Sequence, residues 1–306
     1  MTRTRVPALA LILLLATGSA LALAPGGHSI SIGERGYIVH VPTKQMDMPA
    51  VILNFHGGGG NPLAHQKYAR MDALADREGF LVVYPEGTAP GDGRFLTWNA
   101  GTCCGIASRE NVDDVGYVRR LLDDLARRHA YDATRVYATG FSNGAMLSYR
   151  LAAELSERFA AIAPVAGAPV IERHATARAV PVMHIHSVDD ARALYAGGLG
   201  PPFPLTNLRV QHSPLEERLS IWATENGCGA TFERRDRRES NGHTATLYAY
   251  PGCRAEVLLW KLTGAGHVWP GGEQDYLPRI LGPGTTVIDA NEEIWRFFSR
   301  HRLAPR

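Results

Sequence analysis

The sequence is poor in cysteine and carries no block of like charges. Four cysteines occur in 306 residues, and the 32 basic side chains nearly balance the 30 acidic ones. A balanced chain without a basic stripe lacks the electrostatic footprint of a nucleic-acid-binding protein, and no acidic surface favours a polycationic partner. We therefore expect a small or neutral ligand and no nucleic acid.

The sequence also lacks the usual patterns of a zinc site and of a phosphate-binding loop. The cysteines do not form two C-x-x-C pairs, so their spacing argues against a zinc site. No Gly-Lys-Ser/Thr follows the glycine-rich stretch at residues 57–60, which argues against a phosphate loop. We predict an activity that needs neither a metal nor an organic cofactor.

The beginning of the chain has the composition of an export signal. A basic start, an apolar run and small residues follow one another (Arg3, Arg5; residues 6–16; Ala20, Ala22, Ala24). A membrane anchor is the alternative, but the run ends in small residues without a basic stop. We predict a signal peptide over 1–24, a single domain over 25–306, and a secreted or periplasmic protein without stable membrane association after cleavage. Cleavage would leave 30 basic and 30 acidic residues.

An even number of cysteines in an exported protein favours disulfide bonds. Four cysteines allow three pairings. Cys228 and Cys253 each lie beside a glycine and flank a short hairpin-like region, which favours a bond between them. Cys103 and Cys104 would then remain as a strained vicinal pair or as free thiols.

Apolar runs typical of buried strands alternate with segments of helical pattern. We expect strands at 36–41 (an edge strand), 49–55, 80–84, 135–139, 159–165, 181–185, 244–250 and 256–262, and helices at 66–78, 111–130, 143–153, 215–226 and 289–301. This alternation predicts an α/β fold with a doubly wound, mostly parallel sheet and helices on both faces. Ligands of such folds bind at the carboxyl ends of the strands.

The clearest functional signal is Ser142, which stands in the pattern Gly140-x-Ser142-x-Gly144 between a predicted strand and a predicted helix. A strand that turns into a helix within a few residues forces strained angles on the serine and exposes its hydroxyl. The flanking glycines are needed because a Cβ there would collide with the neighbouring strand and helix. Ser142 is therefore the candidate nucleophile.

Three further stretches follow predicted strands. His56 to Gly60 has four consecutive glycines, whose N–H groups can point at one small anionic volume, and a flexible turn is the alternative. Asp190 and Asp189 follow the strand at 181–185, and we favour Asp190 as the acid of a catalytic triad. His267 lies among glycines on a loop, where packing gives it no role, so we predict it to be the catalytic base.

The stretches HGGGGN (56–61), WNAGTCCG (98–105), GFSNGAMLSYRLA (140–152), HIHSVDD (184–190) and GAGHVWPGG (264–272) occur in this order. Together they resemble the secreted polyhydroxybutyrate (PHB) depolymerase-like esterases of the α/β-hydrolase superfamily, which are allied to feruloyl and acetylxylan esterases. The resemblance extends from about residue 37 to 298. Relatives often have His-Gly-x-x-Asp before the acid, whereas Ser187 takes the glycine position here.

The resemblance implies an esterase that uses Ser142, His267 and Asp190, with the N–H groups of Gly58 and Asn143 as the oxyanion hole. We expect a small-molecule or oligomeric ester substrate, of 3-hydroxyacyl, feruloyl or acetyl type. Trp98 and Trp269 are expected to be walls of the acyl pocket, with simple packing as the alternative. A non-catalytic α/β-hydrolase-fold binding protein and a peptidase are weaker hypotheses, because every part of the catalytic set is present.

Overall fold

The computed structural model describes residues 22–44, 46–89, 95–171, 177–203 and 207–304. The expected signal peptide lies almost entirely outside these residues. In the described part of the chain, no helix is both long enough and apolar enough to cross a bilayer.

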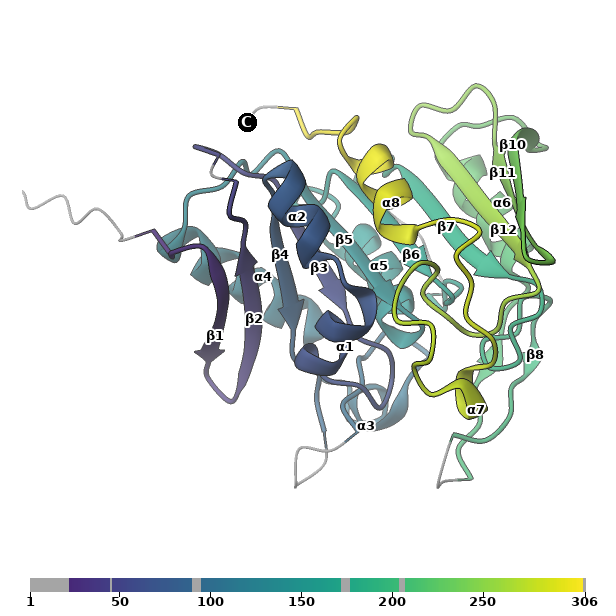
Figure 1. Ribbon diagram of the computed structural model, residues 1–306, viewed down its shortest axis with the longest axis horizontal. Helices are drawn as coiled ribbons and strands as arrows, with labels where there is room; N and C mark the ends of the chain where they lie inside the picture. Colours follow the sequence, from purple (N-terminus) through teal and green to yellow (C-terminus); the bar gives the residue numbers. More distant parts are fainter. Residues whose placement is uncertain (1–21, 45, 90–94, 172–176, 204–206, 305–306) are drawn as a thin grey trace, which may run out of the picture.

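A ten-stranded sheet runs through the molecule in the order β1-β2-β4-β3-β5-β6-β7-β12-β11-β10 (Figure 1). Its six central strands are parallel: β4 (Leu81–Pro85), β3 (Val51–Phe55), β5 (Val136–Phe141), β6 (Ala161–Val165), β7 (Val182–Ser187) and β12 (Val257–Thr263). Antiparallel strands extend both sides: β1 (Gly26–Ile32), β2 (Arg35–Val41), β11 (His243–Ala249) and β10 (Glu233–Ser240). A separate pair, β8 (Gly198–Leu199) and β9 (Gln211–His212), lies between β7 and α6 in the chain.

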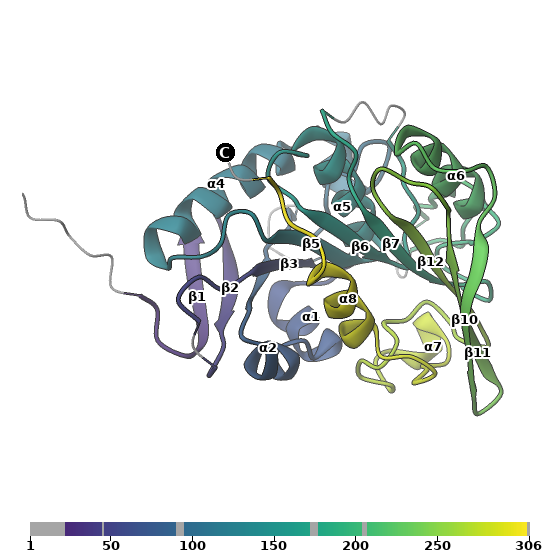
Figure 2. The same ribbon diagram turned by 90° about the horizontal axis from the view of Figure 1, so that it is seen from above.

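Helices cover both faces of the sheet, as predicted (Figure 2). One face carries α4 (Asp114–Arg128), α5 (Asn143–Glu154) and α6 (Leu215–Glu225). The other carries α1 (Pro62–Ala69), α2 (Asp72–Glu78) and α8 (Ala290–Phe298). Short helices α3 (Gly105–Arg109) and α7 (Pro278–Leu281) lie in loops. The central parallel strands are buried on both sides, which explains their continuous apolar sequences and the two apolar cores, one on each face. This is the α/β-hydrolase fold.

Two local predictions were wrong. The strand at 36–41 is not an edge strand, because β1 pairs along its outer side. The expected helix at 66–78 is two helices, because Arg70 has a left-handed backbone (φ 55°) that ends α1. No element was predicted at 233–240, and this highly charged segment forms strand β10, which pairs with β11 at an exposed edge of the sheet.

Both pairs of cysteines form disulfide bonds. The predicted Cys228–Cys253 bond is confirmed, with an S–S distance of 2.03 Å. It joins the chain just after α6 to the connection between β11 and β12. Cys103 and Cys104 form a vicinal disulfide in the loop that leads into α3.

The turn between β5 and α5 is possible only because two glycines allow a very close approach. A Cβ on Gly140 would lie 2.7 Å from the backbone of Gly144 and 2.8 Å from the carbonyl oxygen of Phe55. A Cβ on Gly144 would collide with that same carbonyl oxygen and with the one of His56. Since these neighbours are backbone atoms, no side-chain adjustment could relieve the clash. The first turn of α5 is therefore pressed against the end of β3.

We expect Gly144→Ala to lower the free energy of unfolding by about 1–3 kcal/mol or more, because the new methyl group must displace backbone rather than a side chain. Urea unfolding would measure the loss. Gly27→Ala is the matched control, since nothing lies within 4 Å of the added Cβ. Its effect should stay within roughly 0.5 kcal/mol. Equal stabilities of the two variants would contradict this account of the turn.

Candidate active site

Ser142 occupies the sharp turn between β5 and α5. Its backbone is in a strained positive-φ conformation (φ 55°, ψ −116°). The turn is held in place because the Ser142 N–H donates to the carbonyl oxygen of Val165, at the end of the neighbouring strand β6, at 2.9 Å. The strained, well-anchored geometry exposes the side chain at the carboxyl end of the sheet, as the Gly-x-Ser-x-Gly pattern predicts.

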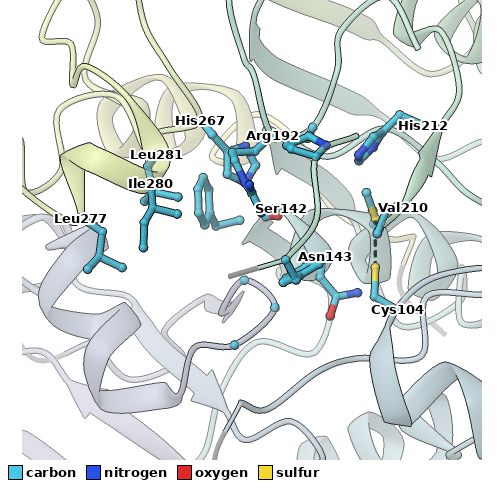
Figure 3. A pocket seen from close by; sticks show the side chains of 18 of the residues that line it. Cys104, Ser142, Asn143, Arg192, Val210, His212, His267, Leu277, Ile280 and Leu281 are labelled. Carbon is cyan, nitrogen blue, oxygen red and sulfur yellow. Dashed lines mark hydrogen bonds between the residues drawn. The ribbon is translucent and has the colours of Figure 1, made fainter. Parts of the chain in front are cut away.

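His267 and Asp190 come together from the ends of two other strands. The loop after β12 carries His267, and the loop after β7 carries Asp190. The Nδ1 of His267 donates to Oδ2 of Asp190 at 2.6 Å, and both side chains are buried. The imidazole also packs on Phe141, the residue before Ser142, with ring centroids 4.6 Å apart. Ser142 and His267 line the same cavity (Figure 3).

The competing acid, Asp189, does not contact His267 and binds a backbone N–H instead. Its side chain is exposed, and its Oδ2 accepts a hydrogen bond at 2.6 Å from the N–H of Gly264, in the loop that leads to His267. Of the two adjacent acids, Asp190 is thus the one in contact with His267.

Asp190 is a buried carboxylate surrounded by donors. Its Oδ1 accepts from the N–H groups of Arg192 and Ala193, both at 2.8 Å, and its Oδ2 accepts from His267 and from Nε2 of His186 at 3.1 Å. Burial alone raises the pKa of the Asp190 carboxyl. The charge of His267 and the hydrogen bonds from His186 and His267 outweigh burial and hold the pKa below its ordinary value.

The glycine-rich stretch lies against the Ser142 turn. A Cβ on Gly57 would be 3.4 Å from the Cβ of Ser142, and one on Gly58 would be 3.6 Å from the Cβ of Asn143. Asn143 is the first residue of α5, where backbone N–H groups have no partner inside the helix. The loop after β3 and the N-terminus of α5 therefore meet beside the serine.

His56 braces this loop. Its Nδ1 donates to the carbonyl oxygen of Gly57 at 2.8 Å, and its Nε2 accepts from the N–H of Gly87 at 3.1 Å. Burial lowers the pKa of His56 to about 4, so the ring is neutral near pH 7 and can make both contacts. The opening histidine of HGGGGN is thus a structural residue.

Trp98 was predicted to line the acyl pocket, and this prediction is wrong. The side chain is fully buried and is absent from the described residues that line the cavity. Its indole N–H donates to the carbonyl oxygen of His56 at 2.9 Å. Its backbone exchanges two hydrogen bonds with the side-chain amide of Asn143, at 2.7 and 3.1 Å. Trp98 therefore links the glycine-rich loop to the first residue of α5.

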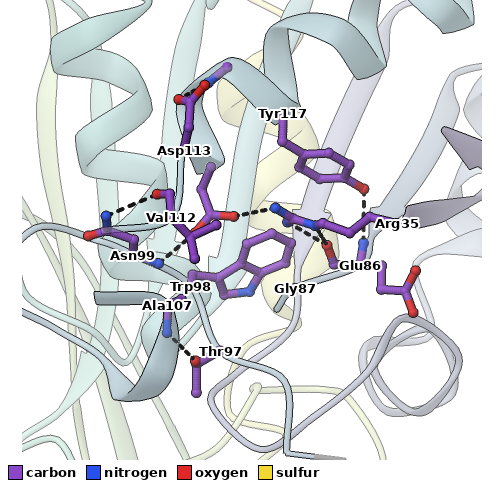
Figure 4. Close-up of polar contacts among 12 residues, drawn as sticks. Arg35, Glu86, Gly87, Thr97, Trp98, Asn99, Ala107, Val112, Asp113 and Tyr117 are labelled. Carbon is purple, nitrogen blue, oxygen red and sulfur yellow. Dashed lines mark hydrogen bonds and ion pairs between the residues drawn. The ribbon is translucent and has the colours of Figure 1, made fainter. Parts of the chain in front are cut away.

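A part-buried ion pair between Arg35 and Asp114 lies beside Trp98 (Figure 4). The guanidinium of Arg35 lies over the rings of Tyr117 and Trp98, 3.5 and 5.3 Å from their centroids. It also pairs with Asp114 at 2.7 Å, and the other oxygen of Asp114 accepts from the N–H of Asn99. This network fixes the loop containing Trp98 to β2 and α4.

Trp269 was also predicted to be a pocket wall, and this prediction is likewise wrong. Its indole is buried away from the cavity, and its Nε1 donates to the side chain of Asn291 at 3.1 Å. Its backbone N–H donates to the hydroxyl of Tyr68 at 2.7 Å. Trp269 therefore anchors the His267 loop to α1 and α8.

The cavity above Ser142 has a volume of about 210 Å³ and an apolar rim. Besides the predicted residues, its wall includes side chains from β5, α5, β9, α7 and several loops: Phe95, Cys104, Phe141, Met146, Arg192, Phe203, Val210, His212, Leu277, Ile280 and Leu281 (Figure 3). No periodic pattern marks these positions in the sequence. Apart from Phe141 and Met146, which are close to Ser142 in the chain, they come from distant segments, so their shared cavity was not predictable.

In the described residues, no group of three or more His, Cys, Asp or Glu side chains is arranged to hold an ion. His212, which lines the cavity near the Asp190–His267 pair, has its pKa lowered to about 4, chiefly by burial.

We expect Asp190→Asn to lower the free energy of unfolding by about 1–3 kcal/mol at pH 7. The reason is that the amide NH₂, itself a donor, would face N–H groups that donate to the carboxylate in the wild-type protein. The folded-state pKa of Asp190 is depressed, so its contribution is present above the unfolded pKa of about 3.9 and is lost as pH falls toward the folded pKa. Denaturant unfolding from pH 7 down to 3 should show the deficit shrinking.

Asp189→Asn is the control, since its amide oxygen can still accept from Gly264. A deficit that is as large at pH 3 as at pH 7, or equal for both variants, would contradict the buried-charge interpretation.

The model of the family described as "Esterase PHB depolymerase" matches residues 36–200. The chain is 30% identical over 232 residues to a bifunctional acetylxylan esterase/xylanase of Neocallimastix patriciarum, covering 75% of this chain but 30% of that protein. It is 32% identical over 231 residues to feruloyl esterase B of Neurospora crassa, covering 72% and 66%. The chain thus spans less than two thirds of the length of these relatives.

Among solved structures, an acetyl xylan esterase from Aspergillus awamori superimposes with a TM-score of 0.60 at 16% identity, over 90% of this chain and 99% of that one. At this identity the likeness supports the fold alone. The family match covers more than half of the sequence and includes the Ser142 turn, the glycine-rich loop and Asp190. This chain belongs to the esterase PHB depolymerase family of carboxylic ester hydrolases.

Proposed function

We propose that this protein is an exported serine esterase in which Ser142, His267 and Asp190 form the catalytic triad. The observation that carries the proposal is that a serine with strained backbone shares a cavity with a histidine whose Nδ1–H is held by a buried carboxylate. That hydrogen bond leaves Nε2 of His267 as the acceptor for the serine proton.

The proposed reaction proceeds through an acyl-enzyme. His267 takes the proton of Ser142 as Oγ attacks the ester carbonyl, and Asp190 stabilises the resulting imidazolium. As the tetrahedral intermediate collapses, the ester C–O bond breaks and His267 gives its proton to the leaving alcohol. Water then attacks the acyl group, again with His267 as base, and Ser142 is released with a carboxylic acid as second product.

The oxyanion would be held by the backbone N–H groups of Asn143 and Gly58. Asn143 is at the N-terminus of α5, where free N–H groups and the helix dipole both favour negative charge. Trp98 supports both donors, since it binds the Asn143 side chain and the carbonyl oxygen of His56. Removing one such donor typically costs about 3 kcal/mol of transition-state stabilisation.

The space around the serine favours an extended substrate. A second hollow, of about 610 Å³, adjoins the cavity and shares Gly59, Phe95, Cys104, Phe203 and Val210 with it. An acyl group in the first space could therefore continue into the second. This supports short oligomeric esters of 3-hydroxyacyl type as substrates, in line with the family match.

Feruloyl or acetyl esters of plant polysaccharides are the second candidate class. Curated relatives of this chain carry acetylxylan esterase and feruloyl esterase names. All of these reactions use the same catalytic groups, so the choice depends on the cavity walls rather than on the triad.

Export is part of the proposal. The chain begins with the predicted signal segment, and all four cysteines are paired in disulfides. Such bonds persist in oxidising compartments, which supports a secreted or periplasmic location.

Ser142→Ala should reduce hydrolysis of p-nitrophenyl acetate, feruloyl esters and 3-hydroxybutyrate oligomers by at least roughly 10⁴-fold, because the nucleophile is lost. A fluorophosphonate should label the wild-type protein on Ser142 and leave the variant unlabelled. Ser148→Ala is the control, since this buried hydroxyl only donates to the carbonyl oxygen of Gly144 within α5. A folded wild-type protein that neither labels nor turns over would instead indicate a non-catalytic binding protein.

Phe95→Ala should lower kcat/KM for a 3-hydroxybutyrate trimer by about tenfold, because the exposed ring borders both hollows and its loss removes apolar contact area. The loss on p-nitrophenyl acetate should be several-fold smaller, since acetate does not extend into the second hollow. Leu63→Ala is the control, because Leu63 is also an exposed apolar residue but lies on α1 and lines neither hollow. Equal losses on long and short substrates would contradict the use of the second hollow.

A further inference from the structure

Behind Asp190 lies a row of buried polar side chains that the ester mechanism does not use. Tyr149 Oη is 2.8 Å from Nδ1 of His184, Nε2 of His184 is 3.1 Å from Nδ1 of His186, and Nε2 of His186 is 3.1 Å from Oδ2 of Asp190. All four side chains are buried. The row extends from the middle of α5 through β7 to the residue that binds His267.

The fold explains why these residues meet. His184 and His186 are two apart on β7, so both side chains project from the same face of the sheet. That face is covered by α5, which carries Tyr149 and begins directly after Ser142. Neighbouring rings enclose the row, with Trp222 against Tyr149 and Tyr195 against His186.

The contacts determine where each proton lies. Nε2 of His186 faces two acceptors, the Asp190 carboxylate and the carbonyl oxygen of Ala193 at 2.8 Å, so this nitrogen carries a proton. A neutral His186 then has a free lone pair on Nδ1, which accepts from Nε2–H of His184. Nδ1 of His184 in turn accepts from the Tyr149 hydroxyl.

If the hydrogen bonds ran in the opposite direction, from His186 toward Tyr149, one polar hydrogen would be left without an acceptor in the described part of the chain. If Nδ1 of His184 donated to Tyr149, its Nε2 would need a donor, and His186 would have to be an imidazolium. The Tyr149 hydroxyl proton would then have no acceptor among the described residues. Burial also lowers the pKa of His184 well below its usual value and raises that of Tyr149 well above, so both are neutral near pH 7.

We propose that Tyr149, His184 and His186 are positioning residues, forming a chain of hydrogen bonds that all donate toward Asp190 and keep its carboxylate ionised and oriented for His267. The assignment to catalysis rests on the proposed esterase function. Aligned hydrogen bonds polarise one another, so the chain strengthens the final donation from His186. It also ties the position of the triad acid to the helix that begins at the nucleophile.

The direct test is ¹⁵N NMR of histidine-labelled protein between pH 7 and 8, with signals assigned through single variants. The chain requires neutral Nε2–H tautomers for His184 and His186 and an Nδ1–H tautomer for His267. An Nδ1–H tautomer at His184, or a doubly protonated His186, would overturn the proposal. This readout does not depend on turnover, so an inactive wild type would refute the esterase proposal while the chain could still be judged.

The functional test uses two variants at one position. His186→Gln can keep a donor near Asp190, whereas His186→Leu removes it. Loss of a hydrogen bond to a buried carboxylate makes protonation of the Asp190–His267 pair easier, so the acid limb of kcat/KM should move up by about one pH unit in His186→Leu. His212 and Tyr68 also face this pair and stay unchanged in both variants. We expect His186→Gln to restore most of the wild-type profile.

Tyr149→Phe removes one hydroxyl from the far end of the row. This variant tests the same role if His186→Leu does not fold. The ¹⁵N resonance of His184 Nδ1 should shift toward that of a nitrogen without a hydrogen bond. The acid limb of kcat/KM should move to higher pH, as in His186→Leu but by a smaller amount. Tyr131→Phe is the matched control, because this buried hydroxyl donates to the carbonyl oxygen of Leu122, away from the site. A folded His186→Leu or Tyr149→Phe protein with an unshifted limb would overturn the positioning role.

Discussion

The close approach of α5 to the end of β3 is the constraint on which the site depends. Gly140 and Gly144 let the helix begin against the carbonyl oxygen of Phe55. The same contact accompanies the strained positive-φ conformation of Ser142 and brings the first N–H of α5 beside the glycine-rich loop. Backbone packing, rather than a side-chain contact, therefore sets the geometry of both the candidate nucleophile and the candidate oxyanion donors.

Buried polar contacts fix the remaining parts of the site. Asp190 is held by two backbone N–H groups and two imidazoles, and Trp98 is held between Asn143, His56 and the cation of Arg35. In a low-dielectric interior such groups are costly when unpaired and strongly oriented when paired. The loops that carry these residues are thus packed as extensions of the core, whereas apolar side chains at the cavity rim are exposed.

The strand ends that carry the candidate site residues and the rim of the cavity differ in burial. The loops that carry Ser142, Asp190 and His267 follow the central strands β5, β7 and β12, which are largely buried. The cavity rim includes the exposed apolar side chains of Phe95, in the loop before α3, and of Leu277 and Ile280, at α7 in the same connection that carries His267. Substitutions at these exposed positions would change the rim of the cavity while leaving the buried contacts of Asp190 in place.

Sequence alone predicted the fold class, because buried strands are continuously apolar, and favoured the Cys228–Cys253 bond among three pairings. It also singled out Ser142, His267 and Asp190 as candidates, because polar side chains that follow strand ends meet at one edge of the sheet. Tertiary structure decided the rest. The charged segment at 233–240 forms a strand because it pairs with β11, and Trp98 and Trp269 are buried in the core instead of lining the cavity. The row from Tyr149 to Asp190 forms only when α5 packs on β7, since hydrogen bonds between distant segments leave no local pattern.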